Sequence, residues 1–86
     1  MVAYDVTFAR TARKELERLS RALRSRVFER IEALATNPRP TGCRKLEGAE
    51  DLWRIRVGDY RVIYSIDDSR RIVDINSIRH RSDAYR

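Results

Sequence analysis

The clearest pattern in the chain is the alternation of hydrophobic and polar residues from Leu52 to Tyr64, interrupted by Gly58-Asp59. Alternation with a period of two is typical of a β-strand, and a two-residue loop that begins with glycine suits a type II′ turn. The segment therefore predicts a β-hairpin in which residues at equal distances from the turn face one another. The predicted pairs are Val57 with Tyr60, Arg56 with Arg61, Ile55 with Val62 and Arg54 with Ile63.

This register separates two kinds of side chain onto the two faces of the hairpin. One face is apolar and carries Trp53, Ile55, Val57, Tyr60, Val62 and Tyr64. The other, the arginine face, carries Arg54, Arg56 and Arg61. Like charges directly across two strands are destabilising, and a guanidinium group donates two hydrogen bonds at once to a phosphate. We therefore expect the arginine face to hold an anion, above all phosphate.

The region before the hairpin predicts one strand and a pair of helices. Val2 to Phe8 alternates and is expected to form a half-buried strand. From about Ala9 to Leu34, apolar residues recur at steps of three and four, which is helical spacing. Ser20 is a candidate N-cap that divides this region into an antiparallel pair of helices, and Asn37-Pro38-Arg39-Pro40 ends it.

The remaining segments complete an α+β fold. Thr41 to Asp51 is expected to form a loop, Asp67-Asp68-Ser69 a turn and Arg71 to Arg79 the last strand. The order predicts an N-terminal strand, a helical hairpin and a three-stranded antiparallel meander, with the helices packed on one face of a small sheet. We expect residues 1–86 to form a single domain with an arginine face open to solvent. The expected core contains Leu16, Leu23, Val27, Ile31, Trp53, Ile55, Val62 and Tyr64.

Composition adds a strongly basic surface. The 86 residues are 42% hydrophobic, which suffices for one small core. The net charge is +6, and of the 19 basic residues only Lys14 and Lys45 are lysines. A GC-rich genome alone explains much arginine, but the excess charge favours a polyanionic partner, most simply nucleic acid. The same positive charge would also attract an acidic protein, and a membrane surface is a weaker third option.

Cys43 is the only cysteine and His80 the only histidine. An internal disulfide is therefore impossible, which fits a reducing cytoplasm, and the two residues are too few for a structural zinc site. We expect neither a metal nor a cofactor. The sequence has no signal-peptide pattern and no long apolar run, so we expect a cytoplasmic protein that does not enter a membrane.

Several residues suited to catalysis or to nucleic-acid binding lie near the C-terminal end of the sequence: Arg79-His80-Arg81 and Tyr85. Histidine exchanges protons near neutrality, which makes His80 a candidate base. Tyr85 offers an aromatic face for stacking on a nucleobase, together with a hydroxyl group. A basic terminal segment is also commonly just a solvated tail, so these residues gain weight only in combination with the hairpin.

Four parts of the chain together resemble the RelE/ParE toxin superfamily: Lys45-Leu46-Glu47-Gly48, Trp53 to Tyr64, Arg79-His80-Arg81 and Tyr85. The resemblance covers essentially the whole chain, including the order of its elements. RelE-type members are ribosome-dependent mRNA interferases, whereas ParE-type members share the fold and poison DNA gyrase. Both are blocked by an antitoxin that wraps the toxin. The resemblance therefore implies an acidic antitoxin partner, operator DNA bound only through that antitoxin, and the ribosome with its mRNA, or alternatively gyrase, as the target.

The resemblance to the RelE branch also implies roles for individual residues. The catalytic candidates are Arg54, Arg56, Arg61, Arg79, His80 and Tyr85, and the candidates for binding nucleic acid are Lys45, Arg54, Arg56, Arg61, Arg81 and Tyr85. The branch often has lysine at positions 54 and 56. Arginine keeps the charge but does not readily deprotonate, so a lysine base is not available here and His80 is its natural substitute.

Resemblance to each of the two branches implies different roles for the same side chains. In the ribonuclease, the 2′-OH of the RNA attacks the adjacent phosphate, His80 or Tyr85 takes the proton, and Arg79 stabilises the transition state or the leaving oxygen. The arginine face neutralises the phosphorane without a metal. In the gyrase inhibitor, the arginines are only a contact surface. The full set of basic residues favours the ribonuclease; gyrase inhibition and an inactive, decayed toxin remain as alternatives.

Overall fold

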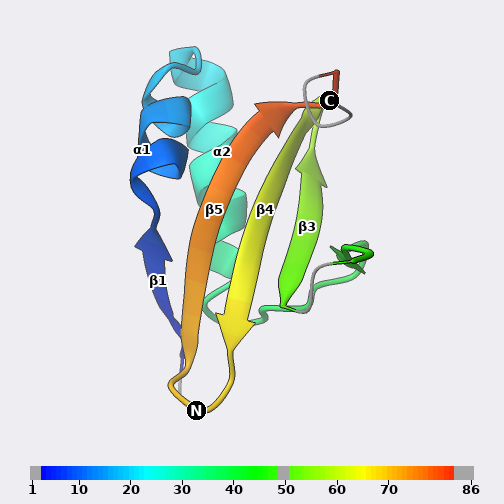
Figure 1. Ribbon diagram of the computed structural model, residues 1–86. Helices are drawn as coiled ribbons and strands as arrows, with labels where there is room; N and C mark the ends of the chain where they lie inside the picture. Colours follow the sequence, from blue (N-terminus) through cyan, green and yellow to red (C-terminus); the bar gives the residue numbers. More distant parts are fainter. Residues whose placement is uncertain (1–2, 49–50, 83–86) are drawn as a thin grey trace.

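The structure, a computed structural model, describes residues 3–48 and 51–82 as two helices on one face of a five-stranded sheet (Figure 1). In chain order the elements are β1 (Asp5–Phe8), α1 (Arg10–Glu17), α2 (Arg21–Ala33), β2 (Arg44–Lys45), β3 (Leu52–Val57), β4 (Tyr60–Asp67) and β5 (Ile72–His80). The strands lie in the order β1-β5-β4-β3-β2. The predicted α+β fold with helices on one face is confirmed.

The predicted break in the helical region is also confirmed. The side-chain oxygen of Ser20 accepts a hydrogen bond from the backbone N–H of Leu23 at 3.4 Å, so Ser20 is the N-cap of α2. Figure 1 shows α1 and α2 side by side and antiparallel over the sheet. Neither of the two described helices has the length and apolar character needed to cross a bilayer.

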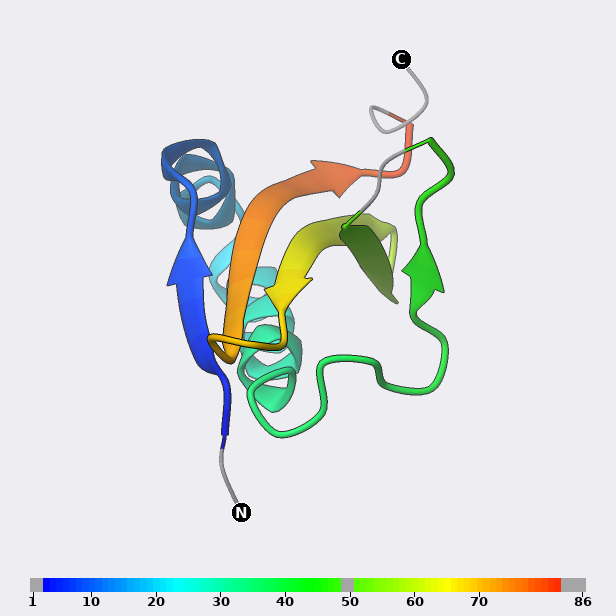
Figure 2. The same ribbon diagram turned by 60° about the horizontal axis from the view of Figure 1, so that its bottom comes forward.

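Two predictions about the strands need correction. The expected loop from Thr41 to Asp51 contains a short strand, β2, which pairs antiparallel with the outer edge of β3 (Figure 2). The first strand is shorter in its described part, beginning at Asp5, and it pairs in parallel with β5. A strand of two residues shows no periodicity, and pairing direction depends on the path through both helices, so neither feature was visible in the local pattern.

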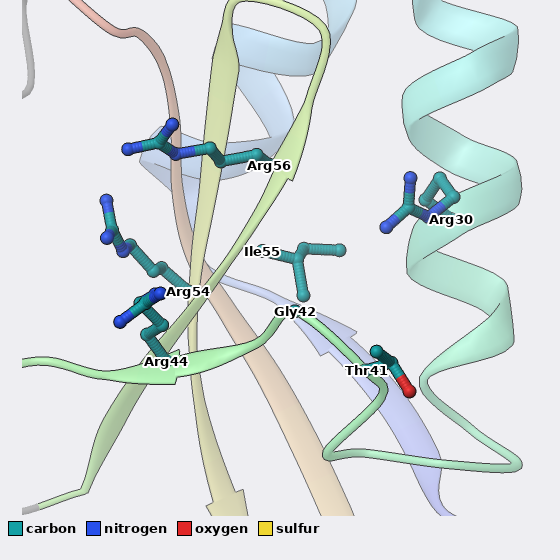
Figure 3. Close-up of a pocket in the computed structure, with 7 residues that line it drawn as sticks. All are labelled: Arg30, Thr41, Gly42, Arg44, Arg54, Ile55 and Arg56. Carbon is teal, nitrogen blue, oxygen red and sulfur yellow. The ribbon is translucent and has the colours of Figure 1, made fainter.

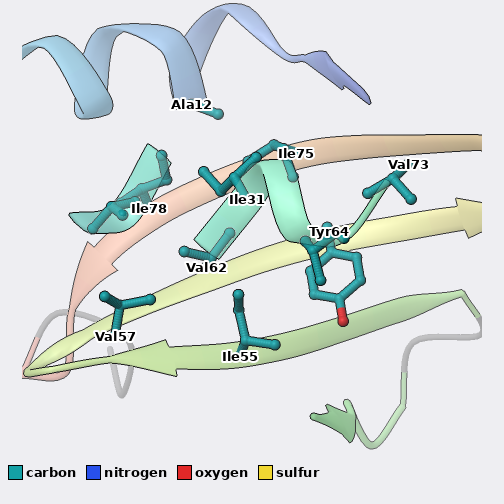
Figure 4. Packing of buried hydrophobic residues seen from close by; sticks show 11 residues of the cluster. Ala12, Ile31, Ile55, Val57, Val62, Tyr64, Val73, Ile75 and Ile78 are labelled. Carbon is teal, nitrogen blue, oxygen red and sulfur yellow. The ribbon is translucent and has the colours of Figure 1, made fainter. Parts of the chain in front are cut away.

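The core lies between the helices and the apolar face of the sheet (Figure 4). Among the described residues, the buried hydrophobic cluster is Ala12, Val27, Ile31, Leu34, Ile55, Val57, Val62, Tyr64, Val73, Ile75 and Ile78. Three predicted core residues, Leu16, Leu23 and Trp53, are only partly buried at its margin. Burying these hydrocarbon surfaces is the main force that fixes the sheet against the helices.

The segment between α2 and β2 closes the open end of this core. The hydroxyl of buried Tyr64 donates to the carbonyl of Pro38 at 2.7 Å, and burial raises the pKa of Tyr64. The guanidinium of Arg39 lies 5.0 Å from the ring centroid of Trp53, a cation–π contact. Trp53 is therefore covered by a loop rather than by a helix, which explains its partial exposure.

Candidate nucleic-acid interface

The predicted hairpin and its register are confirmed residue by residue. Gly58 has a φ of +60°, and Arg71 is the single non-glycine residue with positive φ among the described residues. The second turn residue, Asp59, therefore keeps a negative φ, as a type II′ turn requires. The turn fixes Arg56 opposite Arg61, on the face that points away from the helices.

The third strand extends this pair into a row. Arg61 on β4 also faces Arg79 on β5, so Arg56, Arg61 and Arg79 stand directly across three adjacent strands. We call these three residues the arginine row. Adjacent strands lie about 4.8 Å apart, so the row spans about 10 Å between its outer Cα atoms. Cations do not gather in this way to stabilise a fold, because like charges directly opposite repel.

A β-bulge brings Arg79 into the row. The register of β4 against β5 passes from Ile63–Ser77 to Tyr64–Ile75, which leaves Asn76 as an extra residue. Ile75 and Ile78 therefore both face the core, although strict alternation would place them on opposite faces. Without the extra residue, Arg79 would project toward the helices. The spacing of three between these isoleucines was a signal of the bulge in the sequence.

The solvent exposure of the row differs from the expectation of an open arginine face. Arg61, at its centre, is only 7% exposed and is the single buried charged residue among those described. Arg54 is half-buried, whereas Arg56 and Arg79 are exposed. The prediction of an open face is therefore wrong for Arg61, because it lies on the central strand between two long side chains. A buried guanidinium has few alternative positions, so its donors are already oriented before a ligand arrives.

Glu15 of α1 holds the outer end of the row. Its carboxylate accepts a hydrogen bond from the backbone N–H of Ile78 at 2.8 Å and another from Nε of Arg79 at 3.2 Å. The strand β1 pairs only with residues 72–75 of β5, so Glu15 satisfies a backbone donor beyond the end of that pairing. The contact to Arg79 uses Nε, which leaves its two terminal nitrogens for another acceptor. Glu15 was not among the site residues predicted from the sequence.

His80 lies on the opposite face of the sheet from the row. It pairs with Tyr60, and the two rings meet edge to face with centroids 5.3 Å apart. Its Nδ1 lies 2.9 Å from Oγ of Ser82 and also accepts the Ser82 backbone N–H at 3.3 Å, an arrangement that puts the ring proton on Nε2. Arg79 and His80 nevertheless line one recess of about 460 Å³ at the end of β5.

The other candidates divide between the two ends of the hairpin. Lys45 pairs with Trp53 and so belongs to the opposite face from the row. The backbone N–H of Arg81 donates to the carbonyl of Asp59 at 2.7 Å, and Arg81 lines a small recess with Arg56 and Arg61 at the hairpin tip. Tyr85 lies outside the described residues. The structure thus unites the arginines, with Arg81 beside them, but not Lys45 or His80.

A small sheet with two helices on one face and a cationic row on the other defines the class: the RelE/ParE-like toxins. The family described as the ParE toxin of the type II toxin–antitoxin system parDE matches residues 6–85. A protein named Toxin RelE from Mycobacterium tuberculosis is 37% identical over 96% of this chain and 87% of its own length. The chain therefore belongs to the RelE/ParE superfamily of type II toxins.

Two further relatives add detail. The mRNA interferase toxin RelE of Escherichia coli K12 is 28% identical, with coverage of 98% of this chain and 92% of that protein. A chain in the crystal structure of the toxin–antitoxin complex RelBE2 from Mycobacterium tuberculosis is 31% identical, has a TM-score of 0.81, and covers 92% of this chain and 99% of its own. Both similarities extend over the sheet and both helices.

Proposed function

We propose that this chain is the toxin of a toxin–antitoxin pair and that it inhibits translation by cutting messenger RNA. The observation that carries the proposal is the arginine row, which places three guanidinium groups at the same level of three adjacent strands. The Escherichia coli relative that bears the name mRNA interferase supports the same reaction. During this reaction the phosphodiester becomes a dianionic phosphorane. Such a row of guanidinium groups stabilises the phosphorane better than it stabilises the starting phosphodiester.

The proposed reaction uses the RNA as its own nucleophile. The 2′-oxygen loses its proton to a base and forms a bond to phosphorus as the bond to the 5′-oxygen breaks. The leaving 5′-oxygen takes up a proton from water, and the products are a 2′,3′-cyclic phosphate and a free 5′-OH. Arg56 and Arg61 neutralise the equatorial oxygens, and Arg79 stabilises the transition state or the leaving oxygen. Two residues are candidates for accepting the 2′-OH proton: Tyr85, and His80, which lies across the sheet from the row but lines one recess together with Arg79. The guanidinium groups supply positive charge without a metal, which makes the proposed reaction metal-independent.

The site needs help to orient its substrate. The row lies on a sheet face rather than in a deep cleft, so the protein alone has few contacts that would align the 2′-oxygen, phosphorus and leaving oxygen. A message bound to the ribosome is held in a fixed conformation. This aligns the three atoms and removes the entropic cost of orienting them on the toxin. We therefore propose ribosome-dependent cleavage in the cytoplasm.

The proposed inhibitor is an acidic antitoxin. The relative in the RelBE2 complex was crystallised with its antitoxin. The net charge of +6 and the open sheet edge favour an acidic segment, bound as a helix or as an added strand that covers the region of Arg61 and Tyr85. Contact with operator DNA would then come through the antitoxin alone. Neutralisation by an antitoxin that avoids the arginine row and the C-terminal residues would contradict this arrangement.

A second candidate function is inhibition of DNA gyrase, because the matching family is described by its ParE members. One experiment separates the two. Purified toxin is added to a translation extract, message cleavage is mapped by primer extension, and gyrase supercoiling is measured in parallel. We expect cuts in ribosome-bound message and unimpaired gyrase. Blocked supercoiling with intact message would overturn the ribonuclease proposal in favour of gyrase inhibition.

A further inference from the structure

A second basic feature lies at the outer edge of β3. The strand β2 covers this edge only beside Trp53 and Arg54, its two register partners. Beyond it, a recess of about 390 Å³ opens between β3, the start of β2 and the helix α2. It is lined by Arg30, Thr41, Gly42, Arg44, Arg54, Ile55 and Arg56 (Figure 3).

The arginines approach this recess from two sides. Figure 3 shows Arg30 extending from α2 toward β3, while Arg44, Arg54 and Arg56 project from the other side of the strand. Arg44 and Arg54 are register partners, so their side chains share one face. Among the described lining residues none is acidic. The recess therefore has a strongly positive potential that no lining carboxylate offsets.

Three of these four arginines lack partners within the described part of the chain. Arg30, Arg44 and Arg56 make neither a hydrogen bond nor an ion pair through their side chains with any described residue. By contrast, Arg39 forms a bidentate pair with Asp68, and Arg79 contacts Glu15. Exposed guanidinium groups that line one recess and pair with no described carboxylate are expected to attract an external anion.

We propose that this recess binds a backbone phosphate of RNA that flanks the phosphate at the arginine row. The proposal rests on the proposed ribonuclease function and extends it to the path of the substrate. Arg56 belongs to both sites, so an RNA strand that crosses the row reaches the recess by passing over the edge of β3. Arg30 and Arg44 contact only this flanking phosphate. They bind and align the strand, whereas the row acts on the scissile group.

Phosphate fits these observations better than a carboxylate side chain does. Several planar guanidinium groups can each direct two donors at different oxygens of one phosphate, and a carboxylate has only two oxygens to share. A nucleic acid also presents its phosphates at a regular spacing, so binding at the row brings the next phosphate near the recess.

The test measures binding without cleavage. The probe is a short, fluorescently labelled 2′-O-methyl RNA of mixed sequence, which lacks the 2′-OH needed for attack. Its Kd is measured by anisotropy over a range of salt concentrations for wild type, Arg30→Gln, Arg44→Gln and the double variant. The matched control, Arg13→Gln with Arg70→Gln, removes the same charge from exposed residues outside the recess. Thermal unfolding verifies that each variant is folded.

We expect the double variant to bind about tenfold more weakly, as for loss of one charge-assisted contact. The slope of log Kd against log salt should fall by about 0.7, the value for one phosphate contact to a single strand. The control should keep the wild-type slope. An unchanged slope in the double variant would overturn the recess as a phosphate site, as would weaker antitoxin binding with unaltered RNA binding.

The same variants distinguish this inference from the function on which it rests. If wild type cuts message and the double variant retains the wild-type slope, the recess is excluded and the ribonuclease stands. If no protein cuts message and the slope still falls, the ribonuclease is excluded and the recess remains a site for nucleic-acid phosphate.

Discussion

The two ends of the sheet use charge in opposite ways. At the end near the β4–β5 turn, each key carboxylate has a donor: Asp68 accepts two hydrogen bonds from Arg39 at 2.9 and 3.2 Å and one from the Tyr4 hydroxyl at 2.7 Å. Asp74 accepts from Thr7 at 2.7 Å. At the other end, Arg56, Arg61 and Arg79 stand in register with like charges. The paired charges at the first end stabilise the fold. At the second end Glu15 contacts Arg79, but three guanidinium groups together give an excess of positive charge that attracts an anionic ligand.

The strongest expected effect is on the unbalanced end. Arg61→Ala removes the central, pre-oriented donor of the row, and we expect the rate of message cleavage to fall by ~10²–10³-fold, the usual loss for one such donor. Because the aliphatic part of Arg61 is buried, unfolding free energy should fall as well, by about 1 kcal/mol. Primer extension gives the rate, and urea unfolding gives the stability.

Arg61→Lys is the matched variant for this prediction. It keeps the charge and much of the buried chain but loses the planar pair of donors. We expect stability close to wild type and a rate between those of wild type and Arg61→Ala. Full activity in Arg61→Ala would show that the centre of the row does not contact the reacting phosphate.

The difference between the two ends of the sheet could be predicted only in part from the sequence. Alternation around Gly58-Asp59 predicted the hairpin register and the pairing of Arg56 with Arg61, because a tight turn leaves the strands little choice. The bulge at Asn76 was signalled only by the spacing of two isoleucines. That Arg61 would be buried was not predictable, since exposure depends on neighbours from three strands rather than on alternation along one.

Long-range contacts account for what the sequence analysis missed. Glu15 is one of two acidic residues on the charged helix α1, and its two partners lie 63 and 64 positions away. Arg30 is likewise one of many charged residues in the helical region, and only the packing of α2 beside β3 brings it to the recess. His80 lies between two arginines in the sequence and was therefore grouped with them. The strand register places it on the opposite face of the sheet from the arginine row. Tyr85 lies outside the described residues, so its role remains a prediction.

The second prediction concerns Glu15 and the outer arginine of the row. Glu15→Gln retains hydrogen-bonding capacity but lacks the charge that holds Arg79, and we expect cleavage to slow by about tenfold. Glu15→Ala also exposes the Ile78 N–H and should be slower still. If Glu15 acts by positioning, the effect of Glu15→Gln should vanish in an Arg79→Ala background.

This double-mutant cycle has a clear opposite outcome. If Glu15→Gln slows cleavage equally in the wild-type and Arg79→Ala backgrounds, Glu15 supports the fold and does not position Arg79. A faster Glu15→Gln enzyme would indicate that the ion pair withholds Arg79 from the substrate.

The third prediction is smaller and concerns pH. If His80 accepts the 2′-OH proton, His80→Ala should slow cleavage by about tenfold or more and change the pH–rate profile. Tyr60→Leu removes the ring contact but keeps the imidazole, so it should retain the pH dependence. A wild-type pH–rate profile in His80→Ala would leave Tyr85 as the candidate base.

The smallest expected effect on activity comes from the paired end. Hydrogen bonds from Arg39, and next from Tyr4, lower the pKa of Asp68 from its ordinary 3.8 to about 2. A carboxyl whose pKa is lower in the folded state stabilises the fold above pH 3.8 and loses that contribution as the pH falls toward 2. We therefore expect Asp68→Asn to unfold at lower urea concentration than wild type at pH 7 and to approach the wild-type stability near pH 2, with the rate of message cleavage at pH 7 unchanged. Asp51→Asn, an exposed carboxylate outside this network, is the control. Loss of cleavage in a folded Asp68→Asn protein would contradict the division of the sheet, because it would connect the paired end to the arginine row.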